Sequence, residues 1–119
     1  RRCWGAQWLY PKDQMRLRVP EGDLADFSRG VRALTLQARP RSKHGVDADP
    51  AWMRVKVWAN DKLRLDEAVT ADDLSGRDGL TYRFDPPIRA DADILLEVAN
   101  DSDSFVVLGS ARFNDRAPK

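Results

Sequence analysis

The stretch "WMRVKVW", residues 52–58, decides how this chain folds. Its side chains alternate in character with a period of two, which is the pattern of a β-strand and not of a helix. One face has the apolar character of a core and carries Met53, Val55 and Val57. The opposite face carries Trp52, Arg54, Lys56 and Trp58. This second face predicts either a binding surface or a second buried layer whose cations extend past their neighbours to water.

Strand-like alternation recurs along most of the chain. Outside residues 52–58 it predicts strands at 15–19, 32–38, 62–65, 80–84, 93–99 and 104–113. The last two are the most apolar, as expected of central strands that are covered on both faces. Short segments rich in Asn, Asp, Gly and Pro separate the runs, and these residues form turns. We therefore expect an all-β fold: a single antiparallel β-sandwich of about seven or eight strands.

The connections carry weaker signals. Residues 23–30 and 70–76 predict one or two helical turns, the first capped by Asp23 and the second by Thr70. Two prolines at 86–87 are expected to end the strand at 80–84, because proline cannot donate to a sheet. The loop at 39–50 is long for a hairpin, so we expect it to cross between sheets or to lie as a flap on an edge.

Length and composition fit one globular domain. The chain has 119 residues, of which 42% are hydrophobic and 33% charged. We expect an N-terminal arm at 1–14, a sandwich domain at 15–113 and a tail at 114–119. No apolar run approaches the roughly 20 residues of a membrane helix, so membrane insertion is not expected. Cys3 is the single cysteine, which excludes a disulfide within the chain.

The charge balance argues against a nucleic-acid partner. The net charge is only +1, whereas nucleic-acid-binding domains usually show a strong basic excess. The two halves differ, however: residues 1–64 hold 14 of the 20 Lys+Arg and 7 of the 19 Asp+Glu, a balance of +7, and residues 65–119 have a balance of −6. This asymmetry predicts either contacts with a partner or strands from both halves that interleave and cancel.

No catalytic signature is present, and we do not expect an enzyme. His44 is the single histidine and belongs to a polar loop, and no serine stands in a G-x-S-x-G context. Three Asp-x-Asp pairs could contribute ligands to a structural calcium ion: Asp47/Asp49, Asp91/Asp93 and Asp101/Asp103. Aspartates in turns also cap backbone N–H groups without a metal, and this interpretation is favoured. We therefore expect no cofactor.

The aromatic residues are the strongest functional signal. Trp and Tyr rings stack on the apolar faces of sugars and also anchor protein partners. The expected ligand-binding residues are Trp52, Arg54, Lys56 and Trp58, with Arg41, Asp47 and Asp49 from the long loop as polar partners. The expected partner-binding residues are those of the N-terminal arm: Trp4, Trp8 and Tyr10. The alternative for Trp52 and Trp58 is burial in the core, and the alternative for the arm is docking on this domain's own edge.

The segment "LTYRFDPPIRADADILLEVANDSDSFVVLGSARF", residues 80–113, resembles the C-terminal half of jelly-roll β-sandwiches. It is similar in pattern to galactose-binding and carbohydrate-binding-module-like domains and to small phage decoration or attachment proteins. This resemblance implies a jelly-roll-like, non-catalytic module. Its expected ligand is a glycan or surface polymer. The alternative is a structural subunit of a virion or another assembly, such as a decoration or fibre-base protein. Either role favours an extracellular, cell-surface or virion location and leaves the oligomeric state open.

Overall fold

In the computed structural model, the described residues are 3–5, 7–41, 52–70, 73, 79–102 and 105–116, with only the backbone described at 39–41, 52 and 105. They contain nine strands and no helical element of defined length. The strands are β1 (Cys3–Trp4), β2 (Gln7–Leu9), β3 (Gln14–Arg18), β4 (Val31–Arg41), β5 (Trp52–Ala59), β6 (Lys62–Thr70), β7 (Leu80–Ile88), β8 (Ile94–Asn100) and β9 (Phe105–Asn114). No described helix has the length and apolar character needed to cross a membrane.

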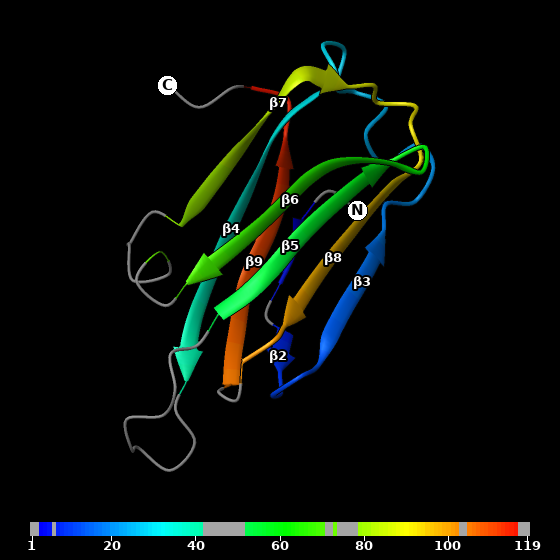
Figure 1. Ribbon diagram of the computed structural model, residues 1–119. Coiled ribbons are helices and arrows are strands. Elements are labelled where there is room, and N and C mark those ends of the chain that lie inside the picture. Colours follow the sequence, from blue (N-terminus) through cyan, green and yellow to red (C-terminus); the bar gives the residue numbers. More distant parts are fainter. Residues whose placement is uncertain are drawn as a thin grey trace.

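The strands form two antiparallel sheets that lie face to face (Figure 1). Sheet A has the order β1-β9-β4-β7, and β2 pairs with β9 beside β1. Sheet B has the order β3-β8-β5-β6. The expected all-β sandwich is therefore confirmed. Because β4 belongs to sheet A and β5 to sheet B, the long loop between them connects the two sheets, although residues 42–51 themselves lie outside the described part.

The pairing of strands is nested. If β1 and β2 count as one interrupted strand, the first strand pairs with the last, β3 with β8, β4 with β7, and β5 with β6. A long antiparallel hairpin that wraps around on itself gives this order, which is the strand order of a jelly roll. The nesting means that most neighbours in the sheets are far apart in sequence.

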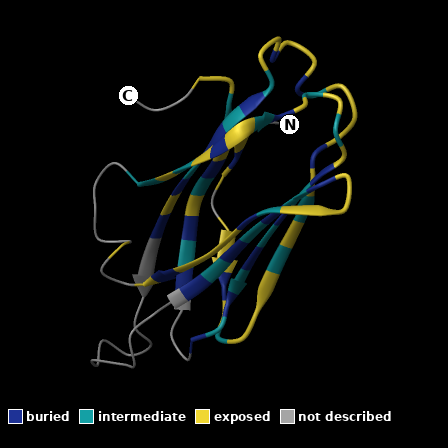
Figure 2. Ribbon diagram, turned by 45° about the horizontal axis from the view of Figure 1, so that its top comes forward, coloured by how far each residue is buried: buried dark blue, intermediate teal, exposed yellow. Residues whose placement is uncertain are grey.

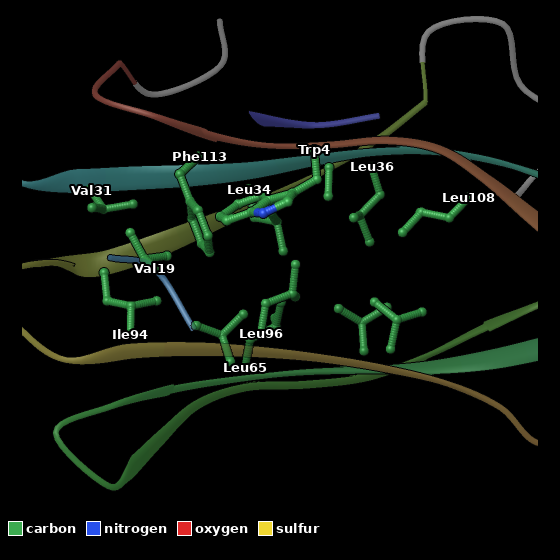
Figure 3. Close-up of a cluster of buried hydrophobic side chains, with 14 of the residues drawn as sticks. Trp4, Val19, Val31, Leu34, Leu36, Leu65, Ile94, Leu96, Leu108 and Phe113 are labelled. Atoms are coloured by element: carbon green, nitrogen blue, oxygen red, sulfur yellow. The ribbon is translucent and has the colours of Figure 1, made fainter. Parts of the chain in front are cut away.

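The core fills the space between the sheets (Figure 3). Met53, Val55 and Val57 are fully buried there, as the alternation in residues 52–58 predicts. Sheet A contributes Leu34, Leu36, Leu108 and Phe113 from above in Figure 3, and Ile94 and Leu96 come from sheet B below. Each fully buried Leu, Val or Ile side chain contributes roughly 1.5–3 kcal/mol relative to an exposed one.

The expected N-terminal arm belongs to the sandwich. Residues 3–4 and 7–9 pair with β9 and form the edge of sheet A. Trp4 enters the core with 9% of its surface exposed and packs edge-to-face on Phe113, with ring centroids 6.0 Å apart. Asn100 fixes the end of this segment, because its Nδ2 donates to the carbonyl oxygens of Leu9 and Tyr10, each at 3.1 Å.

Two expectations about strand ends were wrong. Strand β7 continues through Pro86 and Pro87 to Ile88. The prolines are accommodated because β7 is an edge strand and its register with β4 shifts there, from Ile88 opposite Val31 to Arg83 opposite Ala33. Strand β6 runs to Thr70 and is longer than the four residues expected.

Of the two expected helical segments, the first forms turns, and in the second only residues 70 and 73 are described. Residues 20–30 form successive turns instead of a helix, because each backbone bond spans three residues: Ala25 N donates to Gly22 O at 3.1 Å and Phe27 N to Leu24 O at 2.9 Å. Leu24 and Phe27 are buried and cover one end of the core. At the other segment, Thr70 has the contacts of a cap: Asp73 N donates to Thr70 Oγ1 at 3.4 Å, and Thr70 N donates to Asp73 Oδ2 at 3.0 Å.

Candidate functional site

The face of sheet B that points away from the core is the first candidate surface, and we call it the outer face. Along β5 the fully buried Met53, Val55 and Val57 alternate with half-buried Arg54, Lys56 and Trp58. Figure 2 shows this alternation of buried and more exposed residues along the strands. The side chains of Arg54, Lys56 and Trp58 therefore lie on the outer face, where each is half-buried.

An apolar strip crosses the outer face. Trp58 lies opposite Leu95 of β8 on one side and opposite Leu63 of β6 on the other. Leu63 exposes 46% of its surface, which is high for a large apolar side chain, and Leu95 is half-buried. Three neighbouring strands thus contribute one apolar residue each at adjacent positions in the sheet. Such a strip on an otherwise polar sheet is a feature of binding surfaces.

A row of alternating charge lies beside the strip. The register places the following residues side by side across four strands: Arg16, Glu97, Lys56 and Asp66. Arg16 Nε lies 3.6 Å from Glu97 Oε2. Lys56 Nζ lies 5.7 Å from the centroid of the Trp58 ring, within the range of a cation–π contact, and so joins the charged row to the apolar strip.

Arg54 and Asp66 form an ion pair on the outer face. Arg54 Nε donates to Asp66 Oδ1 at 2.6 Å, diagonally across β5 and β6. This hydrogen bond is the largest cause that holds the pKa of Asp66 below its ordinary value, with the positive charges of Arg54 and Lys56 as further causes. The pKa of Arg54 is raised by the same bond. Both groups stay ionised at neutral pH and can offer a donor and an acceptor to a ligand.

A groove at one end of the sandwich is the second candidate surface, and we call it the apical groove. It lies at the end where β5 turns into β6 and has a volume of about 800 Å³. Its lining residues are Arg18, Val19, Pro20, Glu21, Gly22, Leu24, Ala25, Asn60, Ala90, Asp91, Ala92 and Asp93. Arg18 also lies opposite Leu95 in the sheet, so the groove begins where the apolar strip ends.

Hydrogen bonds hold the rim of the apical groove in place. Arg18 pairs with the carboxylate of Asp93. Asn60 and Asp93 bind each other twice: Asn60 N donates to Asp93 O, and Asp93 N donates to Asn60 Oδ1, both at 2.9 Å. Asn60 and Asp61 have positive φ angles of 50° and 66°, which the tight β5–β6 turn requires. The rim is therefore preorganised by the turn chemistry of two connections.

Part of the charge asymmetry between the two halves of the chain is neutralised by ion pairs in sheet B. The three ion pairs on and beside the outer face each join a basic residue of 1–64 to an acid of 65–119: Arg16–Glu97, Arg18–Asp93 and Arg54–Asp66. Strands from both halves alternate in sheet B, which brings these side chains together. The interpretation that the halves interleave accounts for these pairs.

The other residues expected to bind a ligand lie elsewhere. Arg41 ends β4 in sheet A, and Trp52 begins β5 in sheet B, but the side chains of both are outside the described part. Asp47, Asp49 and His44 also lie outside the described residues. The structure therefore brings together three of the expected ligand-binding side chains, namely Arg54, Lys56 and Trp58.

The three expected partner-binding residues separate. Trp4 is in the core, so it is not available to a partner, and its role is to pack on Phe113. Trp8 and Tyr10 remain at the surface with 53% and 59% of their area exposed. Trp8 lies opposite Val107 of β9, at the edge of sheet A and away from the outer face of sheet B.

The described members of the Asp-x-Asp pairs have protein partners or lie in turns. Arg89 binds Asp91 through two nitrogens, at 3.1 and 3.0 Å, and Asp93 pairs with Arg18. Lys12 Nζ donates to the backbone oxygen of Asp101 at 2.6 Å. In the part of the chain that the structure describes, no group of three or more His, Cys, Asp or Glu side chains is arranged to hold a metal ion. Asp103 is outside that part.

The sequence did not point to Leu63, Leu95, Asp66 or Glu97, nor to the apical groove. Alternation assigns Leu95 and Glu97 to one side of β8, but it places Leu63 and Asp66 on opposite sides of β6. The register shift between Val57 and Trp58 brings Leu63 opposite Trp58, on the same face as Asp66. What alternation also does not supply is the order β3-β8-β5-β6, which makes the four residues neighbours of Trp58 and Lys56. Comparisons with known proteins add no further guide: no protein-family model matches the chain, and no curated protein matches it either.

Proposed function

We propose that this chain is a non-catalytic binding module that recognises a glycan through the outer face of sheet B. The observation that carries the proposal is the position of Trp58, accessible at the centre of an apolar strip and flanked by ionised donors and acceptors. The resemblance to jelly-roll carbohydrate-binding domains and the jelly-roll-like strand order support the same class of function.

The chemistry of the outer face suits a sugar ring. A pyranose has an apolar face of C–H groups, which can stack on Trp58 and cover Leu63 and Leu95. Its hydroxyl groups both donate and accept hydrogen bonds, so they need acceptors such as Asp66 and Glu97 and donors such as Arg54. The strip continues toward the apical groove at Arg18. An extended oligosaccharide fits this arrangement better than a single compact ligand.

The test is affinity electrophoresis of the protein against a panel of soluble polysaccharides, with Trp58→Ala as the decisive variant. We expect retardation by at least one glycan and a loss of affinity of about tenfold or more in Trp58→Ala, which corresponds to about 1.4 kcal/mol. Trp8→Ala is the matched control, because it removes a tryptophan that is more exposed than Trp58 but lies on sheet A. If the same glycan retarded Trp58→Ala and Trp8→Ala equally, the assignment of the glycan site to the outer face would be contradicted.

A second candidate function, as a structural subunit of an assembly, is supported by a different observation. Trp8 and Tyr10 are the most exposed large aromatic side chains among the described residues, and they lie on the edge of sheet A. Exposed aromatic residues beside an edge strand are anchors for protein contacts, as a structural subunit of a virion or another assembly requires. If no glycan binds and the protein self-associates in sedimentation, with loss of association in a Trp8→Ala/Tyr10→Ala double variant, this second function replaces the first.

A further inference from the structure

Three arginines converge on a pocket at one end of sheet A, away from the outer face of sheet B. The pocket has a volume of about 550 Å³ and is lined by Ser28, Arg29, Arg32, Asp115 and Arg116. We call it the arginine pocket. Arg32 also lines an adjacent pocket of about 260 Å³ that contains Arg83 and Asp85. A hollow with three guanidinium groups and one carboxylate has a net charge of +2 and attracts anions.

The fold brings these residues together from distant parts of the chain. Arg29 belongs to the last of the turns that precede β4. Arg32 lies where the register of β4 shifts, between Val31 opposite Ile88 and Ala33 opposite Arg83. Arg116 follows the end of β9, whose Asn114 lies opposite Ala33. The start of β4 and the end of β9 are therefore side by side, which holds the arginines on one small surface.

Within the described part of the chain, the arginines of this pocket lack side-chain partners, whereas four arginines elsewhere have them. Arg16, Arg18, Arg54 and Arg89 each pair with a carboxylate. Across the described ranges, Arg29, Arg32 and Arg116 make no side-chain hydrogen bond or ion pair. The Nε of Arg32 is buried and is the one buried side-chain nitrogen or oxygen there without a hydrogen-bond partner. A buried donor without an acceptor is costly, and native structures rarely leave one unsatisfied.

We infer that the arginine pocket binds a tetrahedral oxyanion, that is, a phosphate or sulfate group. Such a group offers several acceptor oxygens, and a guanidinium can bind two of them at once through parallel N–H donors. The Ser28 hydroxyl supplies a further donor of the required kind. One oxygen would satisfy the buried Nε of Arg32, while Arg29 and Arg116 neutralise the remaining charge. This inference does not depend on the proposed glycan function, because it uses a different sheet and different residues.

The test is isothermal titration calorimetry with inorganic phosphate and, separately, sulfate, at constant ionic strength maintained with chloride. The variants are Arg32→Gln and Arg116→Gln, and we expect each to weaken binding by about tenfold or more, since a charge-assisted contact is lost. Lys62→Gln is the matched control, because it removes one positive charge from an exposed position on sheet B. Its affinity is expected to stay within about twofold of the wild type, because exposed charges far apart are screened by salt.

The same experiment distinguishes the sources of the anion. Binding of dextran sulfate but not of uncharged dextran, lost in Arg116→Gln, assigns the site to a sulfate ester on a polymer. Binding of inorganic phosphate or sulfate alone assigns it to a free ion. The inference is overturned if none of these probes gives a heat of binding, or if Lys62→Gln loses as much affinity as the arginine variants.

Arg116 is exposed and follows the last strand, so its variant remains informative even if Arg32→Gln does not fold. Trp58→Ala must leave oxyanion binding unchanged, which separates this site from the proposed glycan surface.

Discussion

Asn100 is a buried polar residue at the end of β8, and it joins three segments of the chain. Its Nδ2 donates to the carbonyl oxygens of Leu9 and Tyr10. Its Oδ1 accepts from the backbone N of Ser102 at 3.1 Å and from the Ser102 hydroxyl at 2.6 Å. Every polar atom of the amide therefore has a partner, as a buried amide requires. This one side chain fixes both the β8–β9 turn and the path of the N-terminal strands.

Replacement of Asn100 by alanine is expected to lower the free energy of unfolding by about 3 kcal/mol, because two buried carbonyl oxygens lose their donor and the turn loses its acceptor. Ser102→Ala removes one hydroxyl donor and is expected to cost only about 1 kcal/mol. Chemical denaturation followed by circular dichroism measures both. A change for Asn100→Ala that is no larger than that for Ser102→Ala would show that the amide contributes little.

Residue-level prediction gives the position of this connection but not the strand pairing around it. The polar sequence at 100–104 predicts a tight turn that joins the last two strands as a hairpin, but β8 belongs to sheet B and β9 to sheet A, so the connection crosses between the sheets. The contacts of Asn100 with Leu9 and Tyr10, however, join residues 91 and 90 positions apart. Local pattern carries no information about such contacts, because they depend on which strands become neighbours.

At the scale of elements, the ion pair between Arg54 and Asp66 in the β5–β6 hairpin makes the stability of the fold depend on pH. Its pKa in the folded protein lies below the ordinary value of 3.8, chiefly because of the hydrogen bond from Arg54. The unfolded chain therefore takes up the proton first as the pH falls. The stabilisation is fully present above the ordinary pKa and is lost as the pH falls through the lower, folded value.

The variant Asp66→Asn is expected to be less stable than the wild type at neutral pH and to approach it below about pH 3.8, because asparagine does not titrate. Urea denaturation at a series of pH values from neutral to about 2.5 measures the difference between the two curves. Arg54→Gln is the companion variant and is expected to reduce the same part of the pH dependence. Parallel curves for Asp66→Asn and the wild type over the whole range would contradict the contribution of this pair.

Part of the candidate surface can be predicted from the sequence of one strand. Alternation in residues 52–58 predicts which side of β5 is buried, and it correctly assigns Arg54, Lys56 and Trp58 to the other side. The apolar strip needs Leu63 and Leu95 as well, and their positions depend on the register of β5 with β6 and β8. That register includes a shift between Val57 and Trp58, which no periodic pattern predicts.

At the scale of the whole molecule, the nested pairing ends with the N-terminal strands on β9. β1 and β2 contain two and three residues, which is too few for alternation to be recognised in the sequence. They nevertheless close the edge of sheet A and bring Trp4 and Leu9 into the core. Of the two alternatives for the aromatic arm, docking on the domain's own edge therefore applies to Trp4, while Trp8 on the same strands faces solvent.

The contrast between Trp4 and Trp8 gives a direct test of this architecture. Trp4→Ala removes a buried ring that packs on Phe113, and the resulting cavity is expected to lower the free energy of unfolding by about 3–5 kcal/mol. Trp8→Ala removes a ring of the same size from a surface position only four residues away, and its cost is expected to stay within about 0.5 kcal/mol. Far-ultraviolet circular dichroism during guanidinium denaturation measures both without relying on tryptophan fluorescence.

Equal and small losses of unfolding free energy in the two variants would mean that residues 3–9 do not contribute to the cooperative fold. A large loss confined to Trp4→Ala would mean that the first strands hold the sandwich closed, because the core that Trp4 completes includes residues from the last strand, β9.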